Sequence, residues 1–226
     1  MLSNAEFLNA EHLYILYALP VVVLVTNRIP YIGKYFRVTN TLIHESGHAL
    51  AALLMSGEIY SVELFGDTSG TAVTKTHGKF SQFLVSIAGY PFGSALAFLL
   101  FYIISIDHNR IVLYILACFS LLNLMFLVRN TYGIFWIVTF TIIIFVVNFY
   151  AGDFLQFTFS AWLAGIILFE ALYSSIELVM IAKKKPKAAG DAANLARLTH
   201  IPALVWAVLF VAQSGYFIYL TIRLFF

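Results

Sequence analysis

The stretch Tyr132–Phe149, YGIFWIVTFTIIIFVVNF, is 18 residues long and contains no charged side chain. A helix needs roughly 20 predominantly apolar residues to cross the hydrocarbon core of a bilayer. Four further stretches have a similar or greater length and almost no charge: Phe80 to Ser105, Ile111 to Val128, Phe154 to Ala182 and Ile201 to Ile222. The sequence therefore predicts a polytopic, mainly α-helical membrane protein.

The composition of the whole chain agrees with this prediction. Of its 226 residues, 62% are hydrophobic and 11% are charged, whereas roughly 25% of the residues in a soluble domain are charged. The formal net charge of +2 gives no support to a nucleic-acid partner. The single cysteine, Cys118, excludes an internal disulfide and a thiolate zinc cluster, and we expect it to be a small core residue.

A further span is predicted from the shorter run Leu13 to Thr26, which contains Pro20. A secretory signal carries positive charge before its apolar segment, but Glu6 and Glu11 precede this one. We therefore expect a membrane helix that is completed by flanking residues. The expected fold is a bundle of about six full spans.

The distribution of lysine and arginine predicts the topology. Three groups lie between the predicted spans: Arg28, Lys34 and Arg37; Lys75 and Lys79; and Lys183, Lys184, Lys185, Lys187 and Arg197. If a helix starting near Thr41 crossed the membrane, the first and last groups would face opposite sides, against the preference of short basic loops for the cytosol. A helix that enters only partly, from the cytosolic side, makes 11 of the 13 basic residues cytosolic. The amino terminus then lies on the outer side of the membrane, and a cytosolic basic loop is expected over about residues 183–199.

The partly inserted helix, expected over about residues 40–56, carries the motif His44-Glu45-Ser46-Gly47-His48. Two histidines four residues apart on a helix point to the same side and can hold one zinc ion between them. Glu45 then lies beside the metal without being a ligand, which suits a general base that deprotonates water. The motif predicts a zinc hydrolase that works in or at a membrane.

A β-hairpin is predicted over about residues 58–77. Ile59 to Phe65 alternates between apolar and polar residues, Gly66 to Gly70 is rich in turn formers, and Thr71 to Lys75 is a second short strand. Unpaired backbone in such a hairpin must be shielded from lipid. Two interpretations remain open: an open strand edge that pairs with an extended substrate, or a plain cap over the helices.

Catalytic zinc usually has three protein ligands and one open position, so the motif lacks one. Four polar candidates fall on the outer side in the predicted topology: His12, Asp107, His108 and Asp153. Glu170 lies too deep, near the middle of its span. Glu177 has a depth similar to that of His44, which favours it slightly, whereas Asp191 can also be explained as the cap of a short helix.

Two blocks of the sequence resemble the M50B-like branch of membrane zinc metallopeptidases, which are relatives of the site-2 proteases. The first is His44 to Leu54 with the hairpin and Ala88-Gly89-Tyr90 after it, and the second is Gly190-Asp191-Ala192 with Leu195 to Trp206. In site-2 proteases an Asp in a Leu-Asp-Gly motif completes the zinc site, so the resemblance moves Asp191 ahead of Glu177. This chain has no Leu-Asp-Gly sequence and lacks the Asn-Pro element of many relatives.

The resemblance implies a single membrane domain, residues 1–226, that binds one Zn²⁺ per chain and carries out intramembrane proteolysis. We expect a multi-pass protein of the cell membrane that cleaves membrane-associated or transmembrane proteins near the cytosolic face. The lipid bilayer is the other expected partner. A metal-handling transporter and a catalytically silent membrane scaffold are the alternatives. The sequence indicates neither the residues that bind substrate nor the oligomeric state.

Overall fold

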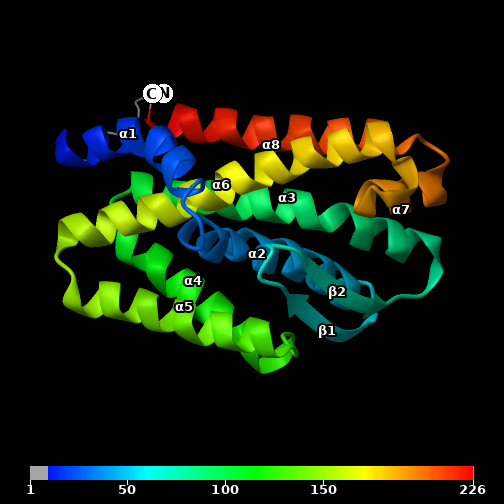
Figure 1. Cartoon of the computed structure of the whole chain (residues 1–226), viewed down its shortest axis with the longest axis horizontal. Coiled ribbons are helices and arrows are strands. Elements are labelled where there is room, and N and C mark those ends of the chain that lie inside the picture. The colour runs from blue at the N-terminus through cyan, green and yellow to red at the C-terminus, as the bar shows by residue number, and fades with distance from the viewer. Residues whose placement is uncertain (1–9, 226) are drawn as a thin grey trace.

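The computed structural model describes residues 10–225. In chain order the elements are α1 (Ala10–Thr26), α2 (Ile32–Leu54), β1 (Glu58–Leu64), β2 (Gly70–Lys75), α3 (Gly78–Ser105), α4 (Asn109–Phe126), α5 (Thr131–Tyr150), α6 (Asp153–Lys184), the 3₁₀ helix η2 (Pro186–Ala188), α7 (Gly190–Thr199) and α8 (Ala203–Phe225). The long helices lie roughly along the longest axis of the molecule, and the hairpin and α7 lie toward one end of the bundle (Figure 1).

Within the described part of the chain, five helices are long and apolar enough to cross a membrane: α3, α4, α5, α6 and α8. They confirm the five long apolar stretches of the sequence. The predicted sixth span, α1, is an apolar helix of only 17 residues with Pro20 inside it. The motif helix α2 begins at Ile32, earlier than the expected start near residue 40, and its partial insertion stays a prediction.

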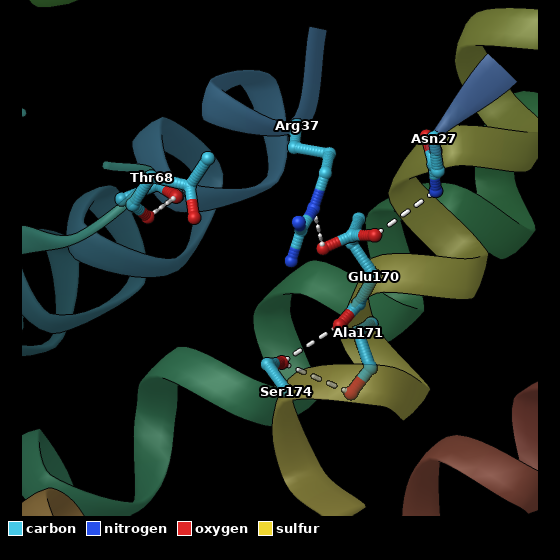
Figure 2. Close-up of polar contacts among 7 residues, drawn as sticks. Asn27, Arg37, Thr68, Glu170, Ala171 and Ser174 are labelled. Carbon is cyan, nitrogen blue, oxygen red and sulfur yellow. Dashed lines mark hydrogen bonds and ion pairs between the residues drawn. The ribbon is translucent and has the colours of Figure 1, made fainter. Parts of the chain in front are cut away.

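The turn between α1 and α2 lies beside the middle of α6. Asn27 Nδ2 donates a hydrogen bond of 3.0 Å to Glu170 Oε1, and Arg37 Nε donates one of 2.7 Å to Glu170 Oε2. Both bonds converge on the same carboxylate (Figure 2). Arg37 is therefore the partner of a buried acid, whereas the sequence analysis placed it in a cytosolic basic loop. Counting charges along a chain does not reveal a pair whose members are 133 residues apart.

The predicted hairpin is present, and β1 is also hydrogen-bonded to the loop after α4. β1 pairs with β2 in antiparallel register, with Val62 opposite Ala72. The other edge of β1 meets the loop after α4, because Val62 N donates to Leu127 O at 2.8 Å and Arg129 N donates to Val62 O at 3.2 Å. The outer edge of β1 is therefore hydrogen-bonded at Val62 and, through the side chain of Asn130, at Leu64.

The core of the bundle surrounds α2. Leu42 and Ile43 on α2 are fully buried, as are Leu100 on α3 and Phe157 on α6. Cys118 contradicts our expectation, because its side chain is exposed on α4. Hydropathy does not separate core from surface in a membrane helix, since lipid chains are as apolar as a protein core.

The Arg37–Glu170 pair gives a test of this arrangement. Replacing Glu170 by Gln leaves the Arg37 charge without its partner, and we expect it to lower the free energy of unfolding in detergent by about 3 kcal/mol. The matched control is Asp153→Asn, which breaks the Arg110–Asp153 pair, whose side chains are 57% and 86% exposed. That change should cost less than about 1 kcal/mol. Equal losses in the two variants would show that Glu170 does not hold α1 and α2 to α6.

Candidate metal centre

The helical register of α2 brings His44 and His48 together. Their Nε2 atoms are 3.0 Å apart, and the two ring planes are nearly perpendicular. His48 Nδ1 lies 2.7 Å from the carbonyl oxygen of Val85 on α3. A carbonyl only accepts, so Nδ1 carries a proton, and Nε2 is turned toward His44 and Asp191. This is the orientation of a metal-binding imidazole, with its second nitrogen held by a backbone oxygen.

The carboxylate that meets the two imidazoles comes from α7. Asp191 Oδ2 lies 3.3 Å from His44 Nε2 and 3.2 Å from His48 Nε2. Glu177, the alternative from the sequence, is not part of this group of possible ligands. Asp191 also does not cap α7, because the cap position is Ala189 and no side-chain capping bond is formed there.

The surroundings of Asp191 keep it ionised. Burial alone raises the pKa of a carboxyl group, but hydrogen bonds and attraction from His44 and His48 outweigh this effect and hold the pKa of Asp191 well below its ordinary value. The position in the first turn of α7 also favours negative charge, because the helix dipole is positive there.

The three donor atoms fit a zinc ion. Ligand atoms at 2.0–2.1 Å from a tetrahedral zinc are about 3.3 Å from one another, and the observed separations are 3.0, 3.2 and 3.3 Å. Two imidazole nitrogens and one carboxylate oxygen are also the donor types that catalytic zinc prefers. The set leaves a fourth tetrahedral position for water or substrate.

The two imidazoles fit between the closely packed helices α2 and α3 because residue 89 of α3 is a glycine. A Cβ atom at Gly89 would lie 2.5 Å from His44 Cε1 and 2.7 Å from Nε2 of each histidine. A Cβ atom at Gly47 would lie 2.8 Å from Phe92 Cβ. The two helices are therefore in close contact at Gly47 and Gly89, and the two imidazoles lie against the backbone of Gly89.

A cavity of about 720 Å³ opens in front of the donor atoms. Glu45 lines it together with His44, His48 and Asp191, and it is 8% exposed. Five residues of β2 also line the cavity: Gly70, Thr71, Ala72, Thr74 and Lys75. A water molecule in this cavity therefore has Glu45 and the three donor residues around it.

Sequence reasoning missed several residues of this site. Tyr90 lines the cavity, packs edge-on against His44 with ring centroids 4.6 Å apart, and stacks on Phe210. Ser46, inside the motif, lies 2.7 Å from Asn123 Oδ1 and ties α2 to α4. The sequence shows Ser46 and Asn123 as polar residues within apolar helices, but it does not indicate that they contact each other.

The fit of the rings against Gly89 predicts a strong effect of a single methyl group. Gly89→Ala should lower zinc affinity by about tenfold or more, since displaced ligands bind metal poorly. Gly93→Ala is the matched control, because the nearest atom to its Cβ, Asn40 Oδ1, is 3.4 Å away. Zinc per chain after dialysis against a weak chelator measures both. Full zinc in Gly89→Ala would show that the rings do not sit against α3.

Comparison with known proteins gives a match to a protein family. The family described as Peptidase M50B-like matches residues 14–221. No curated protein and no solved structure gives a significant match. The matched region contains α2, the hairpin and α7, and so includes every residue of the centre described above. The chain belongs to the Peptidase M50B-like family, as its sequence motifs predicted.

Proposed function

We propose that this chain is a zinc-dependent endopeptidase of the membrane that cleaves membrane-associated or transmembrane proteins. The observation that supports it most is the meeting of His44, His48 and Asp191 around one point, with separations that suit tetrahedral zinc. Membership of a peptidase family supports the same reaction. In this proposal His44, His48 and Asp191 are the zinc ligands and Glu45 is the catalytic residue.

Zinc, when bound, polarises a peptide carbonyl and makes an adjacent water more acidic. The carboxylate of Glu45 accepts a proton from the attacking water and then delivers it to the amine nitrogen of the leaving peptide. His48 keeps its orientation through the hydrogen bond from Nδ1 to Val85 O. Ser46 anchors the same turn of α2 to α4, so Glu45 and the histidines stay in a fixed relation.

The hairpin supports binding of an extended substrate. Within residues 10–225, the backbone of β2 makes hydrogen bonds only to β1, and five of the six β2 residues line the cavity. An extended peptide can add to such an edge through main-chain hydrogen bonds, which do not depend on side-chain identity. Of the two interpretations that the sequence left open, we therefore favour substrate pairing along β2.

The position of the centre favours a cytosolic active site in the cell membrane. Lys183 and Lys184 end α6 at the same end of the bundle as α7 and the hairpin (Figure 1), and short basic segments prefer the cytosol. A transporter would need ionisable groups along a route across several spans, but the deep acid Glu170 already accepts hydrogen bonds from Arg37 and Asn27. The scaffold alternative does not explain why Glu45 faces the metal cavity.

Glu45→Gln tests the assigned catalytic role. Because glutamine cannot accept the proton, we expect the rate of cleavage to fall by at least about 100-fold while zinc per chain stays at the wild-type value. The assay follows cleavage of a fluorescent single-span model protein in detergent. Glu58→Gln, which changes an exposed acid on β1, is the control and should keep full activity. Loss of zinc in Glu45→Gln would assign that residue a structural role instead.

A second test separates the two acids proposed from the sequence. Asp191→Ala removes one of three donor atoms and should release zinc, whereas Glu177→Ala should retain about one ion per chain, because Glu177 lies outside the donor group. Elemental analysis of the purified proteins measures this directly. The reverse result would make Glu177 the third ligand, and absence of zinc from the wild type as well would contradict the enzymatic proposal.

A further inference from the structure

A second cavity borders α7 next to the cavity of the candidate metal centre. It has a volume of about 810 Å³ and is enclosed by the end of α6, by η2, by α7 and by the start of α8. Asn194 and Arg197 border both this cavity and the metal cavity. We call it the basic cavity, because Lys183, Lys187 and Arg197 line it. The motif and the family do not account for it.

The charge of the basic cavity is not neutralised by the protein. Among the described residues that line it, three are cationic and none is acidic. Arg197 Nη2 donates to the neutral oxygen of Asn194 at 3.2 Å, and no ion pair is formed by any of the three cations within residues 10–225. Three cations around one concave space create a positive potential that favours an anion.

The remaining wall of the cavity is apolar. Ala182, Pro186, Pro202, Ala203 and Leu204 are among its lining residues. One helical turn farther along α8, Val208 lies on the same side as Leu204 and is 50% exposed. The cavity therefore continues from a basic rim onto an apolar helix surface. This arrangement fits a molecule with an anionic head and an apolar chain better than it fits a small soluble anion.

The basic cavity also lies at the ends of two candidate membrane helices, which is where a lipid head group would be found. α6 and α8 are both long and apolar enough to cross a membrane, and the cavity is formed where the first ends and the second begins. Basic pockets between membrane helices at this level bind phospholipid head groups. We infer that the basic cavity binds one anionic phospholipid, with its phosphate at Lys183, Lys187 and Arg197 and an acyl chain along Leu204 and Val208.

The test compares two pairs of lysines from the same loop. Lys183→Gln with Lys187→Gln removes two charges from the cavity, and Lys184→Gln with Lys185→Gln removes two charges that do not line it. The full-length proteins are purified, stripped of lipid and mixed with equal amounts of phosphatidylglycerol and phosphatidylcholine in detergent. Native mass spectrometry then counts bound lipid. All four lysines are exposed, so neither variant disturbs the core.

The wild type should retain one phosphatidylglycerol in preference to phosphatidylcholine. The cavity variant should bind it roughly 30-fold more weakly, as expected for the loss of two lysines near an anionic lipid, and the control variant should stay within about twofold of the wild type. Equal losses in the two variants would show general surface attraction and overturn the proposal. So would equal binding of the two lipids, or displacement of phosphatidylglycerol by inorganic phosphate or an acidic hexapeptide at the same concentration.

Discussion

The close approach of α2 to α3 is the constraint on which the metal centre depends. Gly47 on α2 faces the segment around Gly89 on α3, and the space of the missing Gly89 side chain is filled by both imidazoles. The backbone of α3 then fixes one ring further through Val85 O. Because a backbone oxygen and a helix surface hold the two imidazoles, the rings would lose little rotamer freedom on binding a metal, which would favour a precise coordination geometry.

The third donor reaches this point by a different route. Asp191 belongs to a helix of ten residues that crosses no membrane and is held by apolar contacts. Ala192 and Leu195 of α7 are fully buried and belong to the same cluster as Leu178 on α6 and Ala207 on α8. Two helices that are long enough to cross a membrane, α6 and α8, therefore set the position of the carboxylate. The helix α7 lies toward one end of the bundle (Figure 1), and its residues line the cavity at the two histidines.

Local patterns in the sequence predicted much of this structure. The long apolar helices, the hairpin and the His44–His48 pair are all visible over short distances along the chain, because helix and strand periodicity are local properties. The contacts between Arg37 and Glu170 and between Ser46 and Asn123 join distant segments, and no local signal pairs them. The sequence did not predict that Cys118 is exposed. Apolar residues are favoured both in the protein core and on a surface that faces lipid, so an apolar position does not indicate which of the two it occupies.

The choice between Glu177 and Asp191 shows how far arguments from depth can go. Depth along the helix favoured Glu177 slightly, because it lies at a level similar to that of His44, whereas Asp191 follows the end of α6. The structure places Asp191 at the two histidines because the chain turns back through η2 before α7 begins. A turn of that kind depends on the packing of Ala189 and Ala192 against α6 and α8, which hydropathy does not reveal.

The Glu170 carboxylate on α6 joins the amino-terminal segment to the helix that leads to Asp191. Asn27 and Arg37 hold the start of α2 to the middle of α6. His44 follows Arg37 by seven residues, which is about 10 Å along a helix. The same helix α6 continues from Glu170 to Lys184 and leads to α7. The Arg37–Glu170 ion pair thus fixes α2 relative to α6. Because α2 carries the two imidazoles and α6 leads to α7, this pair helps to bring the imidazoles and the Asp191 carboxylate to the same level of the bundle.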